Sequence, residues 1–156
     1  MPLELQLIRA SEFIRLNAEG HFDLETSKLA LANIAWACHK RGIERAMLDL
    51  RALRPRAKPM LSRDDLMVLV NTFHCLGFSR RQRLALLYCS DPHGRARLFA
   101  FITIMRGWQV RSFTRFEDAM LWLSEDVNEK QRADRPRAGQ HRAQVPVKNR
   151  LLLARK

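Results

Sequence analysis

The sequence predicts an α/β domain in which helices pack on a mixed β-sheet, with its elements in the order ββαβαβαβα. Two observations support this fold class. Along the first 126 residues the hydrophobic pattern alternates between the short period of strands and the longer period of helices. A residue typical of turns or helix ends stands at most of the positions where this pattern changes.

Five short segments have the pattern of strands. Leu3, Leu5 and Leu7 form the apolar side of a first, half-buried strand, and residues 13–16 predict a second. The apolar run at 46–50 predicts a buried strand, and the run at 84–89 predicts one that helices cover on both faces. Residues 109–113 predict the last strand.

Four helices separate or follow these strands. The first two begin at Asp23 and Ser62, whose side chains can accept hydrogen bonds from free backbone N–H groups. The third follows the turn at 90–92, and the fourth covers 117–125. Glycines at 42, 77 and 107 end the first three. The predicted inward faces are Leu31, Ile34, Ala35 and Cys38; Leu66, Leu69, Val70 and Phe73; Leu98, Phe101, Ile102 and Met105; and Phe116, Met120 and Leu123.

Charge divides the chain into two parts. The 156 residues include 28 Lys and Arg against 16 Asp and Glu, a formal net charge of +12, which favours a polyanionic or membrane-surface partner. Residues 127–156 hold nine of the cations and two of the acids. We therefore expect a domain over 1–126 and a disordered basic tail over 127–156. An alternative function follows from the tail, namely an adaptor that binds nucleic acid or an anionic membrane by charge.

The sequence favours a cytoplasmic protein. Its start lacks the pattern of a secretory signal, and no apolar run approaches the roughly 20 residues that span a bilayer. Cys38, Cys75 and Cys89 are odd in number and lack CxxC spacing, so we expect reduced, buried thiols. Trp36, Trp108 and Trp122 are expected to pack in the core or against helices rather than stack on bases.

Patterns typical of catalysis or metal binding are weak. No nucleotide-binding glycine loop or hydrolase elbow occurs. Cysteine and histidine are adjacent at Cys38–His39 and at His74–Cys75. Within each pair the two side chains point about 100° apart on a helix, which is poor geometry for binding one metal ion. Asp49 ends a strand like a phosphoacceptor, but the acidic pair and the lysine that such chemistry needs are missing. We therefore expect a protein that is not an enzyme and that needs no metal or cofactor.

Cations gather after two of the predicted strands. The carboxyl ends of parallel strands meet at one edge of a sheet, where α/β folds commonly bind ligands. Free N–H groups at the helix start near His93 would add to an anion site there. A solvated basic loop is the alternative. The predicted anion-binding residues are Arg51, Arg54, Arg56, Lys58, Ser90, His93 and Arg95.

Residues 47–51 (MLDLR), 83–87 (RLALL), 99–100 and 107–123, together with the element order, resemble the STAS domain, the anti-sigma-factor-antagonist fold. More narrowly, the chain resembles bacterial STAS/SEC14-like single-domain proteins over about residues 3–125. The resemblance implies a non-catalytic regulatory or binding module. Its partner would be an acidic protein, a phosphate-bearing small ligand or a lipid, and self-association stays open.

Ser62 stands where regulatory STAS proteins carry a phosphorylated serine, so the resemblance also implies phosphorylation there. The motif of that family, an Asp-Ser pair followed by a small residue and glycine, is missing from this sequence. Helix capping alone explains a serine at this position.

Overall fold

The computed structural model describes residues 4–8 and 12–133, and within them the elements follow the predicted order. The fourth helix continues eight residues past its predicted end at 125, because residues 126–133 contain neither proline nor glycine. The rest of the predicted tail, 134–156, lies outside the described residues. The elements are β1 (Glu4–Ile8), β2 (Phe13–Asn17), α1 (Leu24–Arg41), β3 (Arg45–Asp49), α2 (Arg63–Cys75), β4 (Arg83–Leu87), α3 (Arg95–Met105), β5 (Gln109–Phe113) and α4 (Phe116–Ala133).

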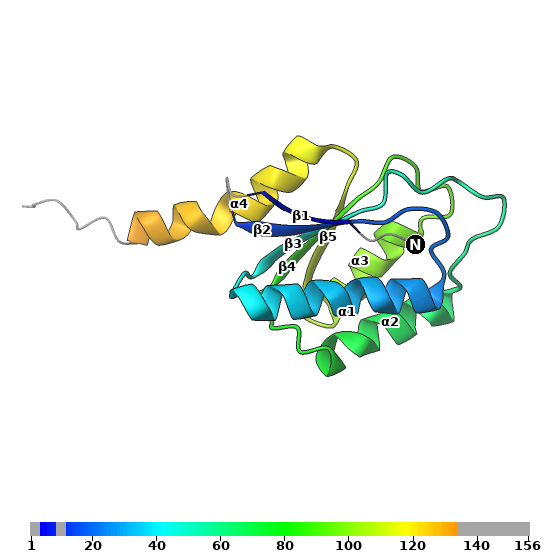
Figure 1. Cartoon of the computed structure of the whole chain (residues 1–156), viewed down its shortest axis with the longest axis horizontal. Coiled ribbons are helices and arrows are strands. Elements are labelled where there is room, and N and C mark those ends of the chain that lie inside the picture. Colours follow the sequence, from blue (N-terminus) through cyan, green and yellow to red (C-terminus); the bar gives the residue numbers. More distant parts are fainter. Residues whose placement is uncertain (1–3, 9–11, 134–156) are drawn as a thin grey trace, which may run out of the picture.

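The five strands form one mixed sheet whose spatial order, β1-β2-β3-β4-β5, is the order of the chain. β1 runs antiparallel to β2, and β2 to β5 are parallel. Because each crossover is right-handed and moves in the same direction, α1, α2 and α3 all lie on one face of the sheet (Figure 1). α4 covers the other face and contacts β3, β4 and β5.

Side chains that alternate along the strands build a core on each face of the sheet. In β3, Leu48 contributes to the core beneath α1, α2 and α3, whereas Met47 packs with Ala119 and Leu123 of α4. The prediction that helices cover β4 on both faces is confirmed, since Leu86 belongs to the first core and Leu87 to the second. Within the described ranges, no helix combines the length and the apolar character needed to cross a membrane.

The predicted inward face of helix α3 is confirmed only in part, since Leu98 and Ile102 are partly buried against the core. The structure buries Phe99, Ala100 and Thr103, while Phe101 and Met105 are 60% and 71% exposed. The sequence offers two apolar stripes on this helix, and periodicity alone cannot choose between them. Thr103 can be buried because its hydroxyl donates to the carbonyl oxygens of Phe99 and Ala100, at 2.9 and 2.7 Å.

The prediction that the tryptophans pack in the core or against helices is wrong for Trp36, which is 62% exposed on α1 with the Lys40 Nζ 4.6 Å from its ring centroid. Trp108 and Trp122 are buried, as predicted. All three cysteines are free, but Cys75 and Cys89 are exposed, contrary to expectation. Cys38 is buried, and this burial raises the pKa of its thiol to about 12.

Candidate ligand-binding cavity

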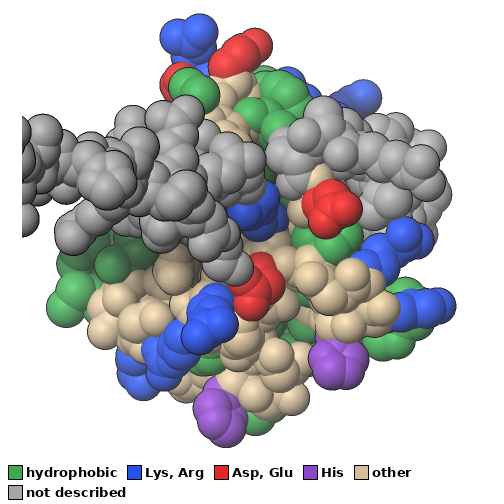
Figure 2. Space-filling view, turned by 90° about the vertical axis from the view of Figure 1, so that its left-hand side faces the viewer, with side chains coloured by type: hydrophobic (Ala, Val, Ile, Leu, Met, Phe, Trp, Pro, Cys, Tyr) green, Lys and Arg blue, Asp and Glu red, His purple; other side chains and the backbone are tan. Residues whose placement is uncertain are grey.

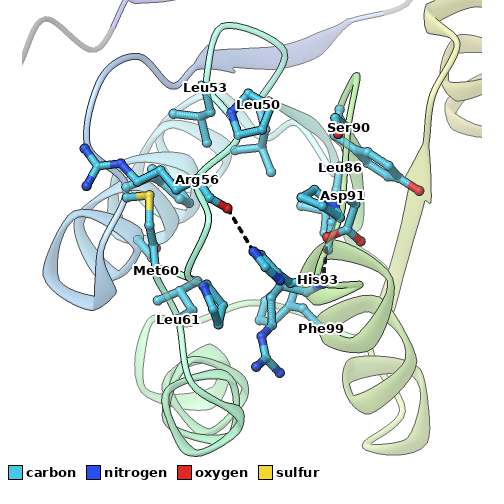
Figure 3. A pocket seen from close by; sticks show the side chains of 18 of the residues that line it. Leu50, Leu53, Arg56, Met60, Leu61, Leu86, Ser90, Asp91, His93 and Phe99 are labelled. Atoms are coloured by element: carbon cyan, nitrogen blue, oxygen red, sulfur yellow. Dashed lines mark hydrogen bonds between the residues drawn. The ribbon is translucent and has the colours of Figure 1, made fainter.

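A cavity of about 170 Å³ opens at the carboxyl ends of β3 and β4, beneath the segment that joins β3 to α2 (Figure 3). It forms there because the crossovers bring the starts of α1, α2 and α3 to the same edge of the sheet. An apolar cavity of about 150 Å³ holds a benzene molecule, so this one has room for a ring or a short acyl segment. Its lining is mainly apolar, with Leu48 and Leu86 from the strands, Leu31, Leu66 and Phe99 from the helices, and Leu53 and Met60 from the joining segment.

Residues 50–61, here called the cover, close the cavity from outside. The cover begins in a turn, in which Leu53 N donates to Leu50 O at 3.1 Å and Arg51 N donates to Asp49 Oδ1 at 3.1 Å. Across the cavity, His93 Nε2 lies 2.9 Å from Arg56 O and so connects the cover to the segment that leads into α3 (Figure 3). This hydrogen bond holds the middle of the cover against the segment before α3.

Six of the seven predicted anion-binding residues line the cavity, namely Arg54, Arg56, Lys58, Ser90, His93 and Arg95. Five of these side chains are exposed and form the rim of the cavity rather than its floor, namely those of Arg54, Arg56, Lys58, Ser90 and His93. We call Arg54, Arg56, Lys58 and Arg95 the cationic rim; Asp91 is the one acidic residue among the lining residues.

Arg95 is the half-buried member of the cationic rim. Its Nε is buried and has no hydrogen-bond partner in the part of the chain that the structure describes. Buried guanidinium N–H groups are normally satisfied by an acceptor. Arg95 is therefore the rim side chain best placed to donate to an anion whose apolar part enters the cavity.

Two of the N–H groups at the start of α3 are not free, contrary to expectation. Asp91 Oδ1 accepts from Arg95 N at 2.7 Å, and its Oδ2 accepts from Arg97 N at 3.2 Å. The Arg97 Nε also lies 3.6 Å from Asp91 Oδ2. The chain's own carboxylate thus takes up two of the backbone N–H groups that an anion would use at this helix start.

The starts of α1 and α2 are capped in the same way. Asp23 Oδ1 accepts from Thr26 N at 2.9 Å, and this hydrogen bond lowers the pKa of Asp23. Ser62 Oγ accepts from Asp65 N at 3.1 Å, while Asp65 Oδ2 accepts from Ser62 N at 2.7 Å, which completes a capping box. Both predicted caps are confirmed; phosphorylation of Ser62 stays a prediction.

Arg51 is the one predicted anion-binding residue that does not line the cavity. Its Nε and Nη2 donate to Asp49 Oδ1 and Oδ2 at 3.0 and 2.8 Å, and Arg15 Nη2 donates to Asp49 Oδ2 at 2.5 Å. Because side chains alternate along β3, Leu48 points to the cavity and Asp49 to the opposite face. Arg51 therefore anchors the beginning of the cover instead of binding in the cavity.

The apolar residues that the cover adds to the lining were not predicted from the sequence. Leu53, Met60 and Leu61 stand in a segment that is otherwise basic and rich in proline. Large apolar residues in such a segment are the one local signal that it folds over something instead of extending into solvent. The residues that meet them, such as Phe22 and Tyr88, come from distant parts of the chain.

Within the described ranges, no group of three or more His, Cys, Asp or Glu side chains gathers in a way that could hold a metal ion. Compared with protein families and with curated proteins, the sequence matches no family model and no curated protein.

Proposed function

We propose that this protein is a non-catalytic binding module of the STAS/SEC14-like type and that it binds a small amphiphilic anion. The apolar part of the ligand, a ring or a short acyl segment, would enter the cavity. Its phosphate or carboxylate would lie at the cationic rim, where Arg95 and Arg54 donate charge-assisted hydrogen bonds. The observation that carries this proposal is the position of a cationic rim directly at the mouth of an apolar cavity.

Positive charge alone does not distinguish this site from the rest of the molecule. Figure 2 shows Lys and Arg side chains also at the opposite end, around the end of α1, with scattered acidic side chains among them. What sets the cavity apart is that its cations adjoin a hollow with a mainly apolar lining. This combination favours a small ligand with an apolar body over an acidic protein surface, which could place only one side chain in the cavity.

The polar groups of the cavity support binding rather than catalysis. His93 and Asp91 are the lining residues best suited to proton transfer. His93 is hydrogen-bonded to the Arg56 carbonyl oxygen, and Asp91 accepts from two backbone N–H groups of α3. Both side chains therefore already have structural partners.

Phenyl phosphate is a suitable probe, since it joins one ring to one phosphate. Burial of the ring, on the order of 100 Å² of apolar surface, contributes about 2.5 kcal/mol. Each charge-assisted hydrogen bond adds about 1.5–3 kcal/mol, and the cost of association offsets a large part of this sum. We expect a dissociation constant on the order of 1 mM for this fragment, and tighter binding for a ligand that fills the cavity.

The test compares three probes in a thermal-unfolding assay, namely phenyl phosphate, phenol and inorganic phosphate. At about ten times its dissociation constant, phenyl phosphate should stabilise the protein by about 1.4 kcal/mol, well above the effect of either half alone. The double variant Arg54→Glu/Arg95→Glu should abolish this difference. A matched control, Arg81→Glu/Arg106→Glu, makes the same charge change at exposed residues outside the cavity and should retain it.

Three results would contradict the proposal. The first is equal stabilisation by inorganic phosphate and phenyl phosphate, which would indicate binding by net charge. The second is an equal loss in the control variant. The third is the absence of any stabilisation by phenyl phosphate, which would count against the cavity as an anion site.

A further inference from the structure

Large apolar side chains are exposed on the outer surface of the layer formed by α1, α2 and α3. Among the described residues, seven large hydrophobic side chains are exposed, and six of them belong to these three helices. Exposed apolar groups that gather on one side of a protein mark an interaction surface. The six, here called the outer apolar set, are Leu29 and Trp36 of α1, Val68 of α2, and Phe101, Ile104 and Met105 of α3.

Helix α3 contributes half of this set. Its exposed stripe carries Phe101 and Met105, whereas its buried face contains the smaller Ala100 and Thr103. A helix that is apolar on all sides is normally buried on all sides. The exposed stripe of α3 therefore has the composition of a packed face without a partner among the described residues.

The charges around the outer apolar set are mainly positive. Helix α3 contains two arginines and no acidic residue. Lys40 lies against the ring of Trp36, with its Nζ 4.6 Å from the ring centroid. Over the three helices the exposed cations are Lys40, Arg41, Arg63 and Arg97, against the exposed acids Glu25 and Asp64. A surface that is apolar and cationic complements a partner that is apolar and anionic.

The spread of the set favours a broad partner. α2 contacts both α1 and α3 and lies between them, so Trp36 and Phe101 stand on helices about two packing distances, roughly 20 Å, apart. A single partner helix, about 10 Å wide, would cover only part of that span. A second copy of this chain, with its own net charge of +12, would bring cations against cations.

We propose that the outer surface of the α1–α3 layer lies on the interface of an anionic lipid bilayer. Trp36, Phe101 and Met105 would insert at the boundary between headgroups and acyl chains, and Lys40 and Arg97 would reach the phosphate groups. This is a peripheral arrangement, in which no helix crosses the membrane. It is independent of the ligand proposed for the cavity.

The experiment is co-sedimentation of the full chain with vesicles of phosphatidylcholine, with and without phosphatidylserine. The basic residues beyond 133 also attract anionic vesicles, so the variants keep the charge and change only apolar side chains. Phe101→Ser/Met105→Ser should lower the partition coefficient by about tenfold for each side chain, since each would bury a large part of its apolar surface. Leu121→Ser, at an exposed hydrophobic residue on α4, is the control and should bind like the wild type.

A second measurement, on the wild type, uses its own tryptophan fluorescence. Trp36 is 62% exposed, whereas Trp108 and Trp122 are buried at 8% and 6% exposure. Lipids brominated on their acyl chains should therefore quench part of the tryptophan emission, and Trp36→Phe, which removes the exposed fluorophore, should remove that quenching. Equal partition of Phe101→Ser/Met105→Ser and wild type, or an absence of quenching, would overturn the proposal. So would a failure of the wild type to bind the anionic vesicles, which would leave this surface to a protein partner.

Discussion

Replacement of Asp49 by asparagine tests how the chain anchors the cover of the cavity. The Asp49 side chain is 6% exposed and accepts hydrogen bonds from the guanidinium groups of Arg15 and Arg51. Asparagine would leave two partly buried cations facing a neutral amide, and breaking a buried ion pair costs about 3–5 kcal/mol. The Arg51 side chain is 38% exposed and keeps contact with water. We therefore expect Asp49→Asn to lower the free energy of unfolding by about 3 kcal/mol, the lower end of that range.

Urea unfolding at neutral pH measures this loss, with Glu19→Gln as a control at an exposed carboxylate. The control should change the free energy of unfolding by less than about 0.5 kcal/mol. A loss of the same small size in Asp49→Asn would refute the argument, because it would mean that the ion pairs at the beginning of the cover contribute nothing to stability.

The pH dependence of the same comparison tests the electrostatic cause. Burial raises the pKa of Asp49, but the hydrogen bonds from Arg51 and Arg15 outweigh it, so the pKa lies below its ordinary value. A depressed pKa in the folded state stabilises the protein fully above the unfolded-state pKa of about 3.9. This stabilisation is lost as the pH falls through the folded-state pKa. The difference between wild type and Asp49→Asn should stay constant from neutral pH to about pH 5 and shrink below about pH 4. A difference that grows on acidification would contradict this account.

Three further predictions concern the cover, a strained glycine and the basic C-terminal residues. His93→Ala should speed tryptic cleavage at the Arg56–Ala57 bond, because it removes the hydrogen bond to Arg56 O. Arg54 and Lys58 of the cover each precede a proline, so trypsin does not cleave readily after them. An unchanged cleavage rate would contradict the role of His93 in holding the cover. In urea unfolding, Gly107→Ala should lower the free energy of unfolding by about 1 kcal/mol more than Gly77→Ala does. Equal losses in the two variants would contradict this prediction. Both glycines have positive φ, but only at Gly107 would a Cβ meet Arg80, at 2.6 Å from Nη1, and disturb its stacking on Trp108. Deletion of residues 134–156, with seven cations and one acid, should reduce the salt dependence of single-stranded DNA binding by a log–log slope of about 4, and an unchanged slope would argue against the adaptor function.

The order of elements could be predicted because its signals are local. Asp23 and Ser62 accept hydrogen bonds from N–H groups three residues ahead, and Gly42 ends α1 with the positive φ that glycine adopts readily. Such interactions depend on a few neighbouring residues, so the sequence displays them directly.

The buried face of α3 could not be predicted because it depends on the sheet. Two apolar stripes satisfy the helical period, and the choice between them is made by contacts with β5 and with Phe73, whose ring centroid lies 5.9 Å from that of Phe99. These partners are far apart in the sequence, and no local pattern reveals them.

The candidate site was predicted in part for the same reason. Its location and six of its polar residues follow from the ends of β3 and β4. The separation of Arg51 from Arg54 follows from the pairing of Arg51 with Asp49 on the opposite face. The capping role of Asp91 has a local origin, and its position four residues before Arg95 could have indicated it.

The most direct test of the proposed cavity is an NMR titration of the methyl-labelled full chain with phenyl phosphate. If the cavity binds the ring, the methyl signals of Leu53, Leu66 and Leu86, which line it, should shift in a saturable way. The methyl signals of Leu29 and Leu121, exposed elsewhere, should not shift. Shifts confined to exposed residues outside the cavity, or no saturable shifts at the lining leucines, would contradict the proposed function.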